Sequence, residues 1–397
     1  MTIQDDLLIL EDESGRVAIG GELTAHVNQL VSGIMVALRG SMGTDGRFHA
    51  SEMLSMGMAG LNSVKPSKPM SLPPSKPVPS NPQATYVMLV SGLSIGGGNA
   101  KASLQLQLLM DFLCGRLGGD NDVALASRVA RVIVCGNSVL STEKLHVTSG
   151  AGGKEERSWS GAANKATAAK LAQENMAPIR ELDTLLAQAL MSVPIDLMPG
   201  SDDPGVFTLP QQPLHPCLLP QSTRFSSLSL VTNPYEVSLN GMLLTGHSGA
   251  PVADIARQTS INAQLAEQMQ VDGAEELSDA QIATQARQVA TKHYLQILQN
   301  TYKWGHMAPT APDSLPCYPF ASDRNGEALD DPFVLSAKRM PHVLFCGNAP
   351  GFATDAGTTL DGHKYRVISV PRFGETGTAV LLDLDSLDVS LLEFGVH

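Results

Sequence analysis

The sequence predicts a mixed α/β protein in which a small N-terminal β module precedes a larger α/β region. Three observations lead to this fold class. Short alternating runs with glycine turns fill the beginning of the chain, a proline-rich stretch follows, and buried-type strands then alternate with loops and helices. With 397 residues, the chain is long enough for more than one domain. We therefore expect a β module over residues 1–60, a linker over 61–85 and an α/β domain over 86–397.

The N-terminal module is predicted from four short runs that are apolar or alternate between apolar and polar residues. These runs cover residues 7–10, 16–23, 33–42 and 47–53. Gly43-Thr44-Asp45-Gly46 is a turn signal between the last two runs. Because about three or four strands seldom close a barrel alone, we expect either that the larger region covers this sheet or that part of the module lies before Met1.

The stretch between Asn62 and Thr85 contains seven prolines, interleaved with serine and lysine. This composition favours an extended, solvated linker. A recognition motif for a proline-binding domain is a weaker alternative for the same stretch.

The larger region begins with a continuous apolar run over residues 86–90, which ends in a glycine-rich loop. A helix follows, because leucines recur at helical spacing from Leu104 to Phe112. Pro178 is expected to open another helix, since proline fits the first helical turn, and Asn240-Gly241 predicts a hairpin turn. The other predicted strands cover residues 129–134, 193–198, 227–232, 235–239, 242–245, 342–346, 364–370, 378–383 and 389–394, and the other helices cover 251–257 and 279–299.

The charge balance argues against a free-standing, non-specific DNA-binding protein. The chain has 27 Lys and Arg residues against 39 Asp and Glu residues, a formal net charge of −12, which repels phosphate at long range. No apolar run approaches the roughly 20 residues that cross a bilayer, so we expect an intracellular, soluble protein without membrane contacts.

The five cysteines form no Cys-x-x-Cys pair, and Cys135 and Cys346 are predicted to be buried, reduced thiols.

Sharp turns that contain glycine or asparagine follow five predicted strands, at the strand ends where α/β proteins usually place ligands. The turns are Val90-Ser91-Gly92-Leu93, Cys135-Gly136-Asn137, Pro199-Gly200-Ser201-Asp202-Asp203, Gly246-His247-Ser248-Gly249 and Gly347-Asn348-Ala349-Pro350. Loops in this order resemble the layout of the calcineurin-like metallophosphoesterases. The resemblance implies a site where carboxylates and imidazoles hold two metal ions, which clamp a phosphate and generate hydroxide.

The residues at the positions that match those metal ligands are poor ligands. Ser91, Leu93 and Asn137 replace Asp or His in the first two loops. The later loops offer Ser201, Asp202, Asp203, His247, Asn348 and Pro350. One imidazole and an acidic pair cannot hold a two-cation cluster, and for His247 alone a structural role is the favoured interpretation. We therefore expect degenerate metal positions with no metal, no cofactor and no catalytic residue.

A second set of motifs is more specific. It comprises Met198-Pro199-Gly200-x-x-Asp203-Pro204, residues 208–217, Leu230-Val231-Thr232-Asn233-Pro234-Tyr235, residues 309–315, Cys317-Tyr318-Pro319-Phe320 and residues 342–348. Together these motifs closely resemble the small-subunit family of eukaryotic DNA polymerase delta, whose members are also called B subunits. The match runs from about Leu7 to the C-terminus.

This resemblance implies an OB-fold followed by an inactivated calcineurin-like phosphoesterase domain, a four-layer αββα sandwich without chemistry of its own. It also implies a nuclear scaffold for DNA replication and repair synthesis. Such a scaffold binds the cysteine-rich C-terminal domain of the polymerase delta catalytic subunit and the N-terminal domain of a third, elongated subunit, and it meets DNA only through the complex.

The proline-dense segments suit partner docking, because proline fixes the backbone and the segment presents apolar side chains at little ordering cost. The opposite interpretation is that these segments merely wrap the core. The candidate docking residues are Leu209, Leu214, His215, Tyr235, Tyr318 and Phe320.

The chain departs from the family pattern in two places. Family members have further sequence before the point that matches Leu7, including early strands of the OB-fold, so we expect an incomplete barrel. Residues 262–283 look like an insertion, and their acidic, Gln- and Ala-rich composition predicts an exposed helical extension.

Two alternative functions remain open from the sequence. One is an active metal-dependent phosphodiesterase or nuclease, as in archaeal relatives that retain the metal motifs. The other is the B subunit of DNA polymerase alpha or epsilon, which shares the architecture. The runs over residues 209–217 and 310–313 favour polymerase delta.

Overall fold

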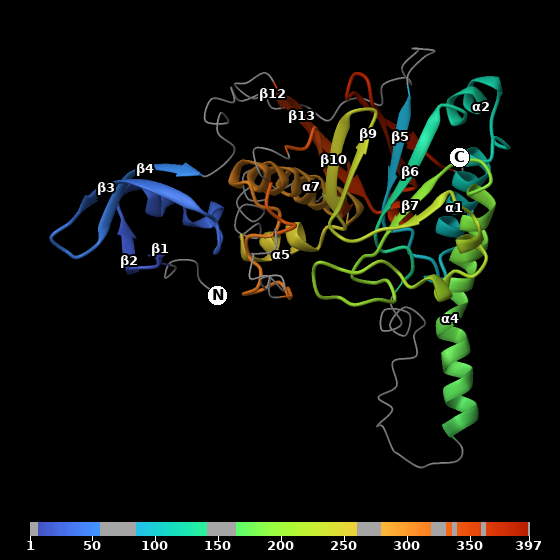
Figure 1. Cartoon of the computed structure of the whole chain (residues 1–397), viewed down its shortest axis with the longest axis horizontal. Coiled ribbons are helices and arrows are strands. Elements are labelled where there is room, and N and C mark those ends of the chain that lie inside the picture. Colours follow the sequence, from blue (N-terminus) through green and yellow to red (C-terminus); the bar gives the residue numbers. More distant parts are fainter. Residues whose placement is uncertain are drawn as a thin grey trace, which may run out of the picture. The chain divides into compact units, whose positions relative to one another are not determined.

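The computed structural model describes residues 7–55, 85–140, 164–259, 279–318, 331–335, 340–358 and 363–395 (Figure 1). The chain divides into two compact units. Unit 1 comprises Met1–Met70, Ala250–Leu344 and Thr354–Val367, and unit 2 comprises Ser71–Gly249, Phe345–Ala353 and Ile368–His397. The linker prediction over 61–85 lies outside the described residues except for Thr85. The predicted insertion over 262–283 also lies outside them except for its last five residues, 279–283, which belong to a helix.

The N-terminal strands form a four-stranded sheet in the order β1-β2-β4-β3. They are β1 (Ile9–Asp12), β2 (Gly15–Gly20), β3 (Val36–Met42) and β4 (Phe48–Ser55). β1 pairs antiparallel with β2, β3 pairs antiparallel with β4, and β2 lies parallel to β4. Within the described residues β1 and β3 remain edge strands, so this sheet is not closed into a barrel.

The strand expected over residues 16–23 is wrong at its carboxyl end. Gly21 has a φ of 89°, in the left-handed region that favours glycine, and it ends the extended backbone after β2. The 3-10 helix η2 (Glu22–Gln29) follows.

The main sheet of unit 2 has six strands in the order β15-β14-β5-β6-β7-β8. The strands are β5 (Tyr86–Val90), β6 (Val129–Cys135), β7 (Ile195–Met198), β8 (Leu228–Leu230), β14 (Thr378–Asp383) and β15 (Val389–Glu393). β5, β6, β7 and β8 are parallel, and β14 lies antiparallel to β5 and to β15. Every residue of β5, β7 and β14 is buried. Burial on both faces explains the continuous apolar run of β5.

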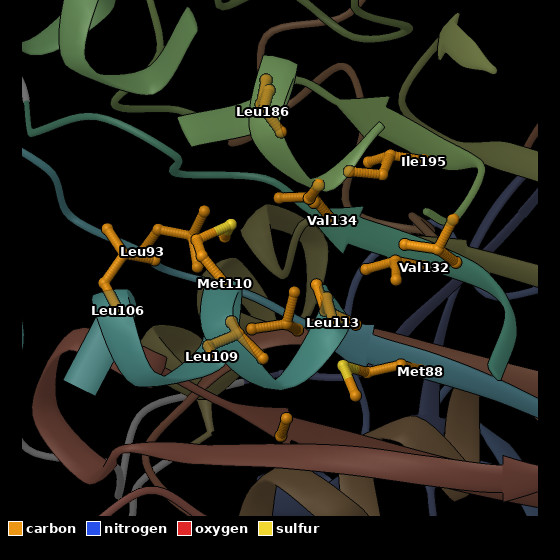
Figure 2. Close-up of a cluster of buried hydrophobic side chains, with 14 of the residues drawn as sticks. Met88, Leu93, Leu106, Leu109, Met110, Leu113, Val132, Val134, Leu186 and Ile195 are labelled. Carbon is orange, nitrogen blue, oxygen red and sulfur yellow. The ribbon is translucent and has the colours of Figure 1, made fainter. Parts of the chain in front are cut away.

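Helix α1 (Ala100–Leu113) packs against this sheet and supplies much of the core. Asn99 caps its amino end, because its side chain accepts bonds from the amides of Lys101 and Ala102. Figure 2 shows Leu106, Leu109, Met110 and Leu113 of α1 close to side chains of β5, β6 and β7. The short helix α2 (Asp120–Ala126), which the sequence analysis did not predict, follows α1.

The prediction that Pro178 opens a helix is wrong. Pro178 lies inside α4 (Asn164–Ala189), although an internal proline removes one hydrogen bond and crowds the carbonyl four residues earlier. Ile179, Leu182 and Leu186, which follow it, are all buried in the core of unit 2. Their burial offsets the cost of the proline and keeps the helix continuous.

A third sheet has the strand order β12-β13-β11-β10-β9. Its strands are β9 (Tyr235–Leu239), β10 (Met242–His247), β11 (Val343–Ala349), β12 (Ala353–Thr358) and β13 (Lys364–Pro371). The predicted hairpin is confirmed, because Asn240 and Gly241 both have positive φ and join the antiparallel pair β9 and β10. β12 is a strand that the sequence analysis missed.

The remaining elements are helices of varied length. Unit 1 contains α5 (Ala250–Gln258) and α7 (Asp279–Trp304), and unit 2 contains α8 (Phe373–Thr376) and the 3-10 helices η4 (Pro216–Leu218) and η5 (Ser222–Arg224). Among the described residues, no helix combines the length and apolar character that a bilayer span requires.

Candidate functional site

The strand-end loops with the predicted site residues come together in unit 2. β5, β6 and β7 are parallel, so their carboxyl ends lie at one edge of the sheet. The approach between loops is close: a Cβ atom on Gly200 would overlap the side chain and backbone of Asn137, and one on Gly347 would overlap the carbonyl oxygen of Cys135. Glycine is required at these two positions because no side chain fits between the loops.

Ser91, directly after β5, is joined to Asn348, which lies near the carboxyl end of β11. The Ser91 hydroxyl donates to the carbonyl oxygen of Pro371 at 2.9 Å and accepts from the Asn348 amide at 2.9 Å. The Asn348 side-chain nitrogen donates to the carbonyl oxygens of Ser248 at 2.8 Å and Cys135 at 3.3 Å. Both side chains are buried, so they bond to the protein itself at the positions where the resemblance placed metal ligands.

Asp203 is the buried carboxylate of the site. Its two oxygens accept from the amides of Val139 at 3.0 Å and Gly200 at 2.8 Å, so this carboxylate ties the loop after β6 to the loop after β7. Asn137 makes a second link, because its side-chain oxygen accepts from the Asp202 amide at 3.1 Å. Ser201, at the start of this turn, is exposed.

His247 ends β10 and is buried, with 1% of its surface exposed. Its Nδ1 accepts from the Gly249 amide at 3.0 Å, which leaves the proton of the neutral ring on Nε2. Within the described residues Nε2 has no hydrogen-bond partner. Burial lowers the pKa of His247 to about 4, so the ring is neutral at physiological pH.

The structure also contains a polar hub that the sequence analysis missed. Asn233 is fully buried and donates to the side-chain oxygen of Gln211 at 2.6 Å and to the Ser248 hydroxyl at 2.7 Å, and it accepts from the Ser248 amide at 3.1 Å. Gln211 continues the network to the carbonyl oxygens of Gly200 at 3.2 Å and Val206 at 3.0 Å. The only hint in the sequence was the polar Asn233-Pro234 pair directly after an apolar strand.

These residues do not fit a two-metal centre. Leu93 is buried in the hydrophobic core, and the side chain of Pro350 has no atom that could bind a metal ion. The Asp203 oxygens and the Ser91 hydroxyl are engaged with main-chain groups. In the part of the chain that the structure describes, no group of three or more His, Cys, Asp or Glu side chains is arranged to hold a metal ion. The arrangement locks loops together.

Two family descriptions match the sequence. Residues 87–354 match the B-subunit family of DNA polymerases alpha and epsilon, and residues 1–53 match the OB-fold domain of the DNA polymerase delta subunit. The small subunit of DNA polymerase delta from rice, Oryza sativa subsp. japonica, is 35% identical over 390 residues, which cover 98% of this chain and 74% of the rice protein. The chain belongs to the family of DNA polymerase delta small subunits.

Other similar proteins carry the same description. The DNA polymerase delta small subunit of Arabidopsis thaliana is 32% identical, over 99% of this chain and 73% of its own length. The corresponding subunit of Saccharomyces cerevisiae is 30% identical, over 98% of this chain and 71% of its own length. A solved archaeal phosphodiesterase is similar over 78% of this chain and 99% of its own, with 9% identity and a TM-score of 0.32. The predicted mixed α/β class with an N-terminal OB-fold is confirmed, and the chain is an accessory subunit of polymerase delta.

The docking residues predicted for this small subunit differ in their accessibility. Leu209 and Leu214 are buried, with 2% and 3% of their surfaces exposed. This corrects their assignment as docking residues, because their side chains pack inside unit 2. His215 and Tyr318 are exposed, whereas Phe320 lies outside the described residues.

Tyr235 is half-buried, and its hydroxyl donates a hydrogen bond to the carboxylate of Asp196 at 2.9 Å. The sequence analysis passed over two exposed apolar residues of the small subunit, Val206 and Phe207. They precede Leu209 in the same proline-rich segment, and only their position between two turns could have indicated exposure.

The two buried titratable groups of this site make opposite contributions to acid stability. The pKa of His247 is about 4 in the folded state and 6.5 ordinarily, so between these values the unfolded state binds the proton more readily than the folded state. The contribution of the neutral ring to the free energy of unfolding is therefore full above pH 6.5 and is lost as the pH falls toward 4. Burial raises the pKa of Asp203 from 3.8 to about 6, although backbone hydrogen bonds oppose the shift. Its share is therefore complete below pH 3.8 and is lost as the pH rises through 6.

We expect His247→Gln to reduce the loss of stability between pH 7 and 4.5, by up to about 3 kcal/mol of unfolding free energy. Asp203→Asn should make that loss steeper, because it removes the group that favours the folded state in acid. Urea unfolding of the wild type and both variants at the two pH values measures these slopes. Equal pH dependence in all three proteins would contradict the assigned protonation states.

Proposed function

We propose that this small subunit is a non-catalytic scaffold of the DNA polymerase delta holoenzyme. The observation that carries the proposal is the hydrogen-bonded closure of the strand-end loops. The Ser91 hydroxyl, the side-chain nitrogen of Asn348 and both side-chain oxygens of Asp203 bond to main-chain groups of neighbouring segments. The side-chain oxygen of Asn348 has no partner within the described residues. The polar groups of the site thus make the platform rigid, and they supply neither a nucleophile nor an electrophile.

The scaffold is proposed to join two other polypeptides. We assign the cysteine-rich C-terminal domain of the catalytic subunit and the N-terminal domain of the third, elongated subunit as its partners in the nucleus. DNA would be reached through the complex, because a net charge of −12 disfavours direct binding to phosphate.

We also propose the domain division 1–60, 61–85 and 86–397, with the last part an inactivated phosphoesterase domain. The matches over 1–53 and 87–354 support the positions of its boundaries.

A hydrolysis assay tests the non-catalytic assignment. We expect single-stranded DNA to be cleaved no faster in the presence of the purified chain and Mn²⁺ than in a control without protein. The alternative function, an active phosphodiesterase, predicts cleavage that Mn²⁺ stimulates. That outcome would refute the proposal if Asp202→Asn and His247→Gln, assayed as folded proteins, both abolished the cleavage, since contaminating nuclease would be unaffected by these variants.

A further inference from the structure

The five cysteines all lie within the described residues, and Cys217 is the only one of them that is exposed. Cys135 and Cys346 are buried, and burial raises the pKa of both thiols. Burial also raises the pKa of the half-buried Cys317, and the half-buried Cys114 thiol donates to a main-chain carbonyl oxygen at 3.6 Å. Because a cysteine reacts as its thiolate and must be reached by the reagent, Cys217 is the cysteine most open to reaction.

A second functional group contacts the Cys217 thiol. Its Sγ atom lies 2.8 Å from Nδ1 of His215, whose side chain is also exposed. The same Nδ1 accepts from the main-chain amide of Cys217 at 3.2 Å. A ring nitrogen that accepts from an amide carries no proton, so the neutral ring has its proton on Nε2 and the thiol donates to Nδ1. The imidazole is therefore in the tautomer that can take up the thiol proton.

The segment that carries this pair is held at both ends by the core of unit 2. Leu214 and Leu219 are buried in that core, and η4 lies between them. The amides of Leu218 and Leu219 donate to the carbonyl oxygens of His215 at 3.0 Å and Pro216 at 3.1 Å. The fixed backbone keeps the thiol and the imidazole side by side, so their contact does not depend on the encounter of two mobile segments.

We propose that Cys217 is a site of reversible exchange with small disulfides, and that His215 accepts the proton of its thiol. The proton passes from Sγ to Nδ1, and the thiolate attacks one sulfur of the incoming disulfide. A bond forms between Cys217 and that sulfur as the S–S bond of the reagent breaks. The other half leaves as a thiolate and takes up the proton from the imidazole. The product is a mixed disulfide, which a further thiol can reverse, and this chemistry is independent of the proposed scaffold function.

Glutathione disulfide, added to the whole reduced chain at pH 7, is the probe that tests this site. Peptide mass spectrometry at successive times gives the rate at which each cysteine is modified. We expect Cys217 to react roughly tenfold faster or more than Cys114 and Cys317, and we expect Cys135 and Cys346 to stay unmodified in the folded chain. Equal rates at Cys217 and at the half-buried cysteines would overturn the proposal.

Two variants separate proton transfer from a purely structural role of His215. His215→Ala removes the ring, whereas His215→Asn keeps a side-chain oxygen that can accept from the Cys217 amide but cannot take up a proton. We expect both variants to slow the modification of Cys217 by about fivefold or more and to leave the rates of the other cysteines unchanged. A wild-type rate in His215→Asn, or in both variants, would overturn the role of the imidazole as proton acceptor.

His49→Ala is the matched control, because His49 is another exposed histidine and lies in β4 of the N-terminal sheet. Its Cys217 should react like that of the wild type, and thermal melting should show that all three variants are folded. If His49→Ala slowed the reaction as much as His215→Ala, the effect would not come from the imidazole beside the thiol, and the proposal would fail.

Discussion

Gly347→Ala is expected to lower the unfolding free energy of the small subunit, with a loss of about 3 kcal/mol, at the upper end of the range for overpacking a buried site. The added methyl would overlap the carbonyl oxygen of Cys135 at the end of β6. The overlap could be removed only if the backbone moved, because the nearest atom is a main-chain oxygen and not the end of a flexible side chain. Urea unfolding at pH 7, followed by circular dichroism, measures the change.

The matched control for this variant is Gly119→Ala. A Cβ atom on Gly119 meets nothing within 4 Å, and its φ of −88° suits any residue. We expect a smaller loss, of about 1 kcal/mol or less, because Gly119 is the N-cap of α2 and alanine is a poorer N-cap than glycine. If Gly347→Ala unfolds at the same urea concentration as Gly119→Ala, the close approach of the loops is wrong.

Asn233→Ala is expected to have an effect of similar size, a loss of about 3 kcal/mol. The variant removes three side-chain hydrogen bonds in a fully buried position and leaves groups of Gln211 and Ser248 without partners. Each bond contributes about 1 kcal/mol, and an unsatisfied buried group costs about 1–3 kcal/mol. Urea unfolding gives the size of the loss, and amide hydrogen exchange over residues 200–215 shows where the structure loosens.

Gln212→Ala provides the comparison for that variant, because Gln212 is exposed and is next to Gln211 in sequence. It should leave both stability and exchange unchanged. Wild-type hydrogen exchange over residues 200–215 in Asn233→Ala would show that the side chains of Asn233 and Gln211 do not hold this loop in place.

Local patterns predicted much of the fold. The apolar runs over residues 86–90 and 129–134 correspond to β5 and β6, and Asn240-Gly241 joins β9 to β10. These features depend on neighbouring residues only, so they can be read from a short window. β12 was missed because only its two threonines favour a strand, whereas its Ala, Asp and Gly residues are depleted in strands. Its pairing with β13 supplies the stability that the local sequence lacks.

The site was predictable in part. The first three turns were correctly placed after β5, β6 and β7, whereas Gly246 and His247 lie in β10 and Gly347 and Asn348 lie in β11. The hydrogen bonds of the site join residues that are distant in the chain, such as Ser91 with Asn348 and Asn233 with Gln211. No local pattern indicates such pairs. The same limit explains the error over Leu209 and Leu214: proline-rich sequence suggested exposure, whereas only the folded core shows that both side chains are buried.

Affinity purification of the tagged small subunit from nuclear extract, with quantification of the proteins that remain bound, tests the central claim most directly. The scaffold function predicts that the polymerase delta catalytic subunit and a third subunit are retained in equal molar amounts with the tagged chain. Recovery of the chain without the catalytic subunit, under conditions in which the extract contains intact polymerase delta, would contradict it.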